Sequence, residues 1–219
     1  EDTFAYSAPA MKHLLQQDAD IRWMGKVDEL LTGDDPVAVE LRAVGVTLDY
    51  APVLDIHTNP RNPIIGDRAL AENAEEVATL GAVIVKTLQD HGVAACGKHF
   101  PGHGDTHVDS HNDLPLIPKA TAQLDTLELV PFKQAINAGI KSIMIAHLEM
   151  PSLEKQPHVP TTLSKNTVTG LLKNKLGFDG LVVTDAMNMQ GITKYFKDGD
   201  AELMAFKAGN DLILMSPDI

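Results

Sequence analysis

The sequence predicts an α/β fold, a (β/α)₈ barrel of the TIM type of which about five β/α units are visible in this chain. The first observation is that short apolar runs alternate with amphipathic stretches long enough to be crossover helices. The second is that every apolar run opens on a glycine and ends in polar residues. Runs that are apolar throughout are typical of strands buried on both faces of a parallel sheet.

The predicted elements follow one another in a regular order. Strands are expected within five glycine-led runs, at residues 45–56, 92–100, 139–150, 180–189 and 209–217. Helices are expected between them at residues 74–91, 120–138, 163–176 and 200–208. Thr162 or Ser164 is a candidate cap for the third helix, and Asp198 or Asp200 for the fourth. Residues 36–219 are thus predicted to form a partial (β/α) barrel catalytic domain of right-handed units, after a helical segment over residues 1–35.

The predicted barrel is incomplete. An eight-stranded barrel takes about 250 residues, whereas here the fifth unit reaches Ile219 without its helix. An open arc would leave backbone groups unpaired along both edges. We therefore expect the missing strands to come from chain segments outside this sequence, from residues 1–35, or from another subunit.

Charge and composition disfavour several classes of partner. The 219 residues include 30 acidic and 18 basic side chains, and the net charge of −12 would repel nucleic acid and anionic membranes. No apolar run approaches the roughly 18 residues that a membrane-spanning helix needs. The chain begins at Glu1 without a signal-like segment, so we expect any targeting peptide to be absent or already removed.

Ionisable residues gather where the predicted strands end. The carboxyl ends of parallel strands form the functional face of barrels and of other α/β folds. The alternative is that these positions are simply solvated. The residues concerned are Asp55, Lys98, His99, His147, Glu149 and Asp185.

The segment "KHFPGHGDTHVDSHNDLP", residues 98–115, carries four histidines spaced by four, at positions 99, 103, 107 and 111. On a helix they would share one face and could bind a metal ion. Pro101, Gly102 and Gly104 instead predict a loop, because proline lacks the backbone donor and glycine disfavours helix. Asp105, Asp109 and Asp113 lie near enough in sequence that a metal site on this loop stays an alternative.

Within the same loop, Asp109 and His111 suggest acid/base chemistry. Histidine titrates near neutrality, and an aspartate on its second ring nitrogen fixes the tautomer and stabilises the cation. Residues two apart on an extended loop point the same way, so the two side chains can touch. The alternative is a loop aspartate that bonds to local backbone.

Four motifs occur in order from about residue 45 to residue 219: "YAPVLDIHTNPRNPIIGDRAL", "GKHFPGHGDTHVDSHNDLP", "GFDGLVVTDAMNM" and "AGNDLILM". With them the chain resembles family 3 glycoside hydrolases, specifically the β-N-acetylglucosaminidase (β-N-acetylhexosaminidase) branch. The resemblance implies a retaining hydrolase on a (β/α)₈ barrel, without metal or other cofactor. Its carbohydrate substrate would be terminal β-linked N-acetylglucosamine, from peptidoglycan recycling or from chitin fragments.

The resemblance also implies roles for individual residues. Asp185, in "VVTDAMNM", would be the nucleophile that forms a glycosyl-enzyme. His111 would replace the usual second carboxylate as acid/base, oriented by Asp109. The residue types suit double displacement, which needs an ionised carboxylate and a proton donor, although Asp185 could instead cap the following helix. Other matching positions would hold sugar hydroxyls, namely Arg68, Lys98 and His99, or line the pocket, namely His147 and Asp55.

Three alternatives stay open. A histidine acid/base does not repel phosphate as a carboxylate does, so a β-glycoside phosphorylase of the same family is one. A truncated, non-catalytic barrel that binds sugar is the second, and a metal-dependent hydrolase the third. Residues 162–196 are most similar to exported members of the family, which favours a bacterial periplasmic or exported location over a cytoplasmic one.

Overall fold

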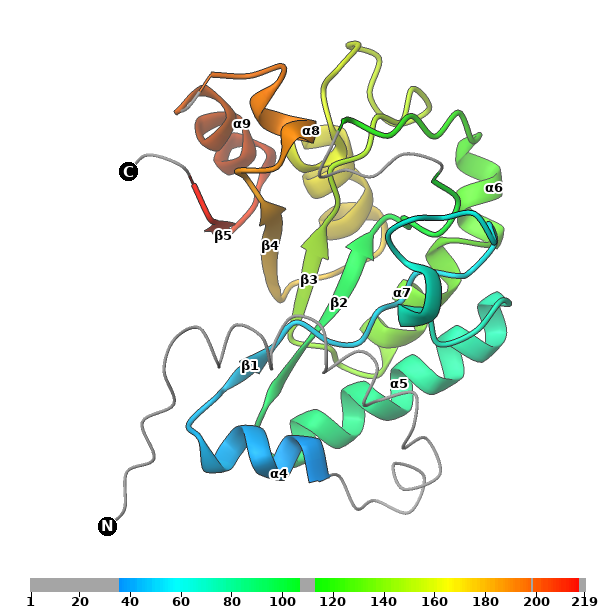
Figure 1. Cartoon of the computed structure of the whole chain (residues 1–219), viewed down its shortest axis with the longest axis vertical. Coiled ribbons are helices and arrows are strands. Elements are labelled where there is room, and N and C mark those ends of the chain that lie inside the picture. The colour runs from blue at the N-terminus through cyan, green and yellow to red at the C-terminus, as the bar shows by residue number, and fades with distance from the viewer. Residues whose placement is uncertain (1–35, 107–112, 198, 217–219) are drawn as a thin grey trace.

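The structure is a computed structural model that describes residues 36–106, 113–197 and 199–216. Within these residues the sheet has five strands, all parallel, in the order β1, β2, β3, β4, β5. Figure 1 shows these strands side by side, with helices α5 and α7 packed against them. Sequential parallel strands joined by helices confirm the prediction of a TIM-type barrel that is incomplete in this chain.

The elements alternate along the chain much as predicted. The strands are β1 (Leu48–Asp49), β2 (Ala94–Phe100), β3 (Ser142–Ile145), β4 (Leu181–Ala186) and β5 (Leu212–Leu214). The helices are α4 (Pro36–Ala43), α5 (Ala74–Asp90), α6 (Thr121–Thr126), α7 (Leu129–Asn137), α8 (Gln190–Thr193) and α9 (Asp200–Ala208), with 3₁₀ turns η2 (Gly66–Arg68) and η3 (Thr161–Leu163) and the π-helix η4 (Asn166–Lys175). Among the described residues, no helix has the length and apolarity needed to cross a membrane.

Two of the predicted elements differ in detail. The expected helix over residues 120–138 is divided into α6 and α7. Pro131 lacks a backbone N–H and is tolerated only in a first turn, which is where α7 contains it. The first predicted strand is regular only at Leu48–Asp49, but residues 51–54 go on bonding to β2 through Ala51 O, Pro52 O and Leu54 N–H.

The predicted caps were partly wrong. Ser164 Oγ accepts a hydrogen bond from Thr167 N–H at 3.3 Å beside η4, as expected of a capping side chain. Asp200 is not a cap, because α9 begins with it and the chain enters the helix at Gly199, whose N–H is bound by Glu202 Oε2 at 2.8 Å. Asp198 lies outside the described residues.

All but one of the glycines that open the predicted strands also end helices. Four of them have positive φ: Gly45 at 83°, Gly92 at 80°, Gly139 at 81° and Gly209 at 110°. Each follows a helix (α4, α5, α7 and α9 in turn) within two residues. A left-handed residue is a common way to end a helix, and glycine adopts that conformation at no steric cost. The pattern therefore marks where the chain leaves a helix to enter the sheet.

Leu54 joins the first strand region to its neighbours. Its side chain is buried and lies between two glycines, Gly81 of α5 and Gly97 of β2. A Cβ atom added at Gly81 would come within 2.5 Å of one Leu54 methyl, and one added at Gly97 within 2.6 Å of the other. Since Asp55 comes next in the chain, this packing also fixes the start of the segment that enters the site described below.

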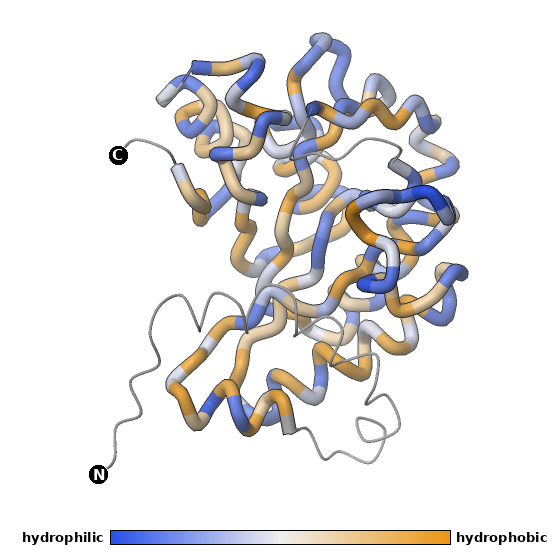
Figure 2. Tube along the Cα trace, in the orientation of Figure 1, coloured by the Kyte–Doolittle hydropathy of each residue, from blue (hydrophilic) through white to orange (hydrophobic). Residues whose placement is uncertain are grey.

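Apolar side chains are exposed at the β5 end of the sheet. Figure 2 shows hydrophobic residues along the strands and alternating character along the helices, as expected of a buried sheet. In the last unit, however, Leu203, Phe206, Leu212 and Met215 are 51%, 67%, 37% and 48% exposed. Such exposure fits an edge that further chain would cover. The source of the missing strands stays a prediction.

We predict a strong coupling between Leu54 and Gly81. Gly81→Ala should destabilise the protein by about 1–3 kcal/mol because the new methyl overlaps Leu54, although alanine is the better helix former by about 1 kcal/mol. In a Leu54→Ala background the same substitution should stabilise by about 1 kcal/mol, since the overlap is gone. Urea unfolding of the four proteins measures this cycle.

The matched control is Gly170→Ala in η4, where the nearest atom to the new methyl is Lys165 O at 3.7 Å, an ordinary contact. It should be neutral or stabilising. Equal effects of Gly81→Ala with and without Leu54 would contradict this packing.

Candidate active site

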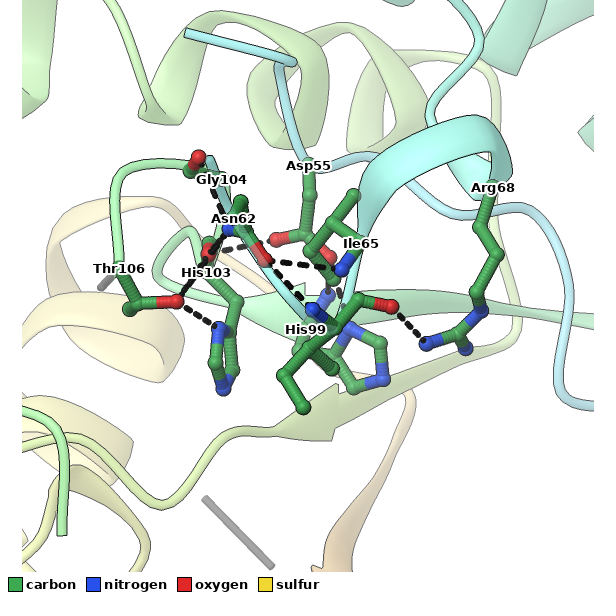
Figure 3. A network of polar contacts seen from close by, with 9 residues as sticks. Asp55, Asn62, Ile65, Arg68, His99, His103, Gly104 and Thr106 are labelled. Carbon is green, nitrogen blue, oxygen red and sulfur yellow. Dashed lines mark hydrogen bonds and ion pairs between the residues drawn. The ribbon is translucent and has the colours of Figure 1, made fainter. Parts of the chain in front are cut away.

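A buried carboxylate organises the carboxyl end of the sheet. The Asp55 side chain is fully buried. Its Oδ2 accepts hydrogen bonds from the His99 backbone N–H at 3.1 Å and from His99 Nδ1 at 2.7 Å, and its Oδ1 accepts one from the His103 N–H at 2.6 Å. Figure 3 shows the three residues in one network. Because the carboxylate is the acceptor in each bond, Nδ1 of His99 carries a proton.

Burial and the two histidines set the charges in this network. Burial raises the pKa of Asp55, but the attraction of His99 and the hydrogen bonds from His99 and His103 outweigh it, so that the pKa lies below its ordinary value. Burial, with repulsion from His99, lowers the pKa of His103 to about 4. At neutral pH, Asp55 is therefore ionised and His103 is neutral.

Two asparagines tie the loop after β2 to the segment before η2. Asn62 Nδ2 donates to His103 O at 2.9 Å and to Gly104 O at 3.0 Å. Asn62 Oδ1 in turn accepts from the N–H groups of Ile64 and Ile65 at 2.8 and 2.9 Å. Asn59 Nδ2 donates to Thr106 O at 2.8 Å. Residues 101–106 are thereby held on the chain that follows β1, as Figure 3 shows for Asn62.

Glycine is required where this loop crosses the earlier segment. A Cβ atom at Gly104 would lie 1.8 Å from Ile56 O, which no side chain can tolerate. Gly102 has φ 128° and faces the Glu128 side chain. As predicted from Pro101 and these two glycines, residues 101–106 contain no helix. The peptide bonds Lys98–His99 and Phe100–Pro101 are cis.

Asp185 lies at the end of β4, within electrostatic reach of the histidines. Burial raises the pKa of Asp185, but attraction to His99 and His147 and a hydrogen bond from the Ala186 N–H hold it below the ordinary value. The bond joins Ala186 N to Asp185 Oδ1 at 2.8 Å. Residue Asp185 is partly exposed, whereas Asp55 is buried. The structure thus places a carboxylate that is ionised at neutral pH on the same rim as His99.

The other predicted binding residues take different places. Lys98 is buried in β2. Burial raises the pKa of the nearby Cys96 thiol to about 12, while Lys98 acts to lower it and Asp185 acts to raise it. His147 follows β3 and is fully buried. Arg68, in η2, is partly exposed, and its Nη1 donates to Ile64 O at 3.3 Å. Asp55, His99, His147 and Asp185 are thus brought within electrostatic reach of one another. Arg68 lies on η2, the turn that follows Asn62 in the chain (Figure 3).

Three of the residues singled out in the histidine loop, His107, Asp109 and His111, lie outside the described residues, so the predicted dyad stays a prediction. Elsewhere, in residues 36–106, 113–197 and 199–216, histidine, cysteine, aspartate and glutamate form no group of three suited to a metal ion.

Directly after residues 107–112, a surface cluster links three loops. Lys194 Nζ lies 2.7 Å from Asp113 Oδ2, and Tyr195 OH donates to Asp113 Oδ1 at 2.9 Å. These bonds, the Lys194 bond above all, lower the pKa of Asp113 to about 2. The Tyr195 ring stacks on His158 with ring centroids 4.7 Å apart. Asp113 is therefore held against the segment that follows α8.

Four polar residues of the network were not among the predicted site residues: Asn59, Asn62, His103 and Thr106. The two Asn-Pro pairs in "NPRNP" mark turns, which was the available signal. The residues around Asn62 give no sequence signal that its side chain bonds to a loop 41 residues later.

Comparison with known proteins identifies the family of this chain. Residues 25–219 match the family model described as the glycosyl hydrolase family 3 N terminal domain. The chain is 39% identical, over 82% of its length, to β-hexosaminidase A of Pseudoalteromonas piscicida. It covers 32% of that relative.

Two solved structures extend the comparison. A glycoside hydrolase family 3 β-N-acetylglucosaminidase from Paenibacillus sp. str. FPU-7 is 46% identical with a TM-score of 0.83, over 89% of this chain and 37% of that one. The β-glucoside phosphorylase BglX is 25% identical with a TM-score of 0.84, over 91% of this chain and 38% of that one. The chain is thus part of a barrel domain of the glycosidase class, and it belongs to glycosyl hydrolase family 3.

The buried His103 should make stability depend on pH. Unfolded, it titrates near 6.5, and folded near 4, so between these values the unfolded state binds more protons. The free energy of unfolding should therefore fall as pH falls through this window, by at most about 3 kcal/mol from this group. Urea unfolding across the window, for the wild type and for His103→Gln, measures the difference.

His103→Gln should have a shallower slope, whereas Gly170→Ala, which changes no titratable group, should keep the wild-type slope. Identical pH dependence in wild type and His103→Gln would contradict the buried neutral histidine.

Proposed function

We propose that the protein containing this chain removes terminal β-linked N-acetylglucosamine by a retaining, two-step hydrolysis. The observation that carries the proposal is the ionised carboxylate of the partly exposed residue Asp185 at the end of β4, within electrostatic reach of His99. The names of the relatives, β-hexosaminidase and β-N-acetylglucosaminidase, support this substrate class. The natural source would be peptidoglycan or chitin fragments.

In the first step, an Asp185 oxygen attacks the anomeric carbon and the bond from that carbon to the leaving oxygen breaks. His111 donates its proton to the leaving oxygen, and Asp109 stabilises the histidine in this role. In the second step, neutral His111 takes a proton from water, whose oxygen attacks the anomeric carbon and releases Asp185. A neutral histidine repels the anionic nucleophile less than a second carboxylate would.

The residues around Asp185 divide into two groups in this proposal. Lys98, His99 and Arg68 bind sugar hydroxyls. Asp55 acts behind them, because its buried oxygens already accept three hydrogen bonds from His99 and His103. It positions His99 by holding the Nδ1 proton, which directs the opposite ring edge to the substrate.

A second candidate activity is phosphorolysis, favoured by the similarity to a β-glucoside phosphorylase. Phosphate would then replace water in the second step. Product analysis in phosphate buffer separates the two activities, since phosphorolysis gives a sugar 1-phosphate and hydrolysis gives free sugar. If the chain turns over no chromogenic β-N-acetylglucosaminide, the non-catalytic sugar-binding alternative is favoured.

Asp185→Ala should lower kcat/KM on a chromogenic β-N-acetylglucosaminide by at least about 10⁴-fold, since no other group takes the covalent step. A 2-fluoro sugar analogue should label the wild type on the Asp185 peptide, as located by mass spectrometry. The control is Asp179→Ala, an exposed aspartate on the same β/α unit, before β4, which should keep wild-type rates. Wild-type-like turnover by Asp185→Ala would remove this residue from the mechanism.

His111→Ala should slow substrates with poor leaving groups by about 10²- to 10⁴-fold. Substrates with activated aryl leaving groups need no proton donor for the first step and should lose far less. A series of aryl glycosides graded by leaving-group pKa measures the dependence. Asp109→Asn should give the same trend more weakly. Equal losses on all leaving groups would count against general acid catalysis by His111.

A further inference from the structure

The buried histidine after β3 makes hydrogen bonds through both ring nitrogens. His147 Nε2 lies 3.0 Å from Ala186 O, and His147 Nδ1 lies 2.6 Å from Thr162 Oγ1. Both partners are protein atoms, and the side chain has no exposed surface. The protonation state of this ring can be deduced from its partners.

Each nitrogen must carry a proton. A carbonyl oxygen only accepts, so Nε2 donates to Ala186 O. The hydroxyl of Thr162 has one proton, and its oxygen lies 2.6 Å from Ala146 O, another pure acceptor. Without a proton between them, two oxygens at that distance would repel each other. The Thr162 proton therefore belongs to the bond with Ala146 O, and Thr162 Oγ1 accepts from His147 Nδ1.

A ring with both nitrogens protonated is an imidazolium cation. A cation with no exposed surface is costly unless an anion lies close by. Strands β3 and β4 are paired with Ile145 opposite Thr184, which brings the residues just after them, His147 and Asp185, to the same rim. Ala186 connects the pair, because its O accepts from His147 and its N–H donates to Asp185.

The charges around this pair come from every neighbouring element. β2 contributes Lys98 and His99, and the segment after β1 contributes Asp55. The loop after β2 contributes His103, which is neutral at neutral pH, and η3 contributes the neutral Thr162. Asp55 already accepts three hydrogen bonds from His99 and from the His103 backbone. Among the described residues, Asp185 is thus the carboxylate left for His147, and attraction to His147 is among the causes that lower the Asp185 pKa.

We propose that His147 is a buried imidazolium that keeps Asp185 ionised, a positioning residue for the nucleophile and not a ligand of the sugar. The proposal rests on the proposed function only in calling Asp185 the nucleophile. The charge pair itself is a property of the chain without substrate.

The direct test is ¹⁵N NMR of the imidazole nitrogens in the full chain, with His147 identified by its absence from the spectrum of His147→Gln. Both nitrogens should stay protonated from about pH 5 to about pH 8, well past the range where a free histidine loses its charge. A His147 ring with one unprotonated nitrogen at neutral pH would overturn the proposal. The measurement does not depend on catalytic activity.

A second measurement follows the Asp185 carboxyl by ¹³C NMR in His147→Gln, which keeps a side-chain donor and an acceptor but removes the charge. The Asp185 titration should move to higher pH, and in an active enzyme the acidic limb of the kcat/KM profile should move with it. His91→Gln, the remote control, should leave both unchanged. An Asp185 titration unaltered by His147→Gln would contradict the charge pair, since lost packing alone gives no such shift.

These outcomes separate the two proposals. A doubly protonated His147 with no covalent label on Asp185 would support the charge pair while the proposed function fails. A labelled Asp185 beside a neutral His147 would do the reverse.

Discussion

The site depends on one constraint, the burial of the Asp55 carboxylate. An ion removed from water costs several kcal/mol unless hydrogen bonds and opposite charge replace the solvent. All three hydrogen bonds to Asp55 come from His99 and His103, at the end of β2 and in the loop after it. The chain therefore cannot bury Asp55 without also placing the His99 ring and the start of the histidine loop.

The burial of Asp55 also affects the charge of Asp185. The electrostatic influence of His99 on Asp185 depends on where Asp55 holds the His99 ring. On its other side, Asp185 is influenced by His147, which bonds to the Ala186 carbonyl. Asp55, acting through His99, and His147 thus both favour the charged form of Asp185. At neutral pH the rim therefore carries an ionised carboxylate on β4.

The sequence carried the parts of this architecture that local chemistry controls. Glycine ends a helix wherever the chain turns into the sheet, and strand ends in parallel folds are polar, so the order of elements and the rim residues Asp55, His99, His147 and Asp185 could be predicted. The burial of each rim residue could not be predicted, because the local sequence "PVLDI" is compatible with either a buried or an exposed Asp55. The Asn62 and Asn59 bonds join residues 41 and 47 positions apart, and only packing determines them.

The most direct test of this account is amide hydrogen exchange in Asp55→Asn. The carboxylate has two acceptor oxygens, but the asparagine has only one. Its NH₂ group would replace the other oxygen and would face an N–H donor of His99 or His103, with which it cannot form a hydrogen bond. The backbone amides of His99 and His103 should exchange about 10- to 100-fold faster than in the wild type, as expected for the loss of hydrogen bonds to a charged group. Amides in the middle of α5, such as that of Ile84, should change little. Wild-type protection at His99 and His103 in Asp55→Asn would show that packing alone places them and would contradict the central role of the buried carboxylate.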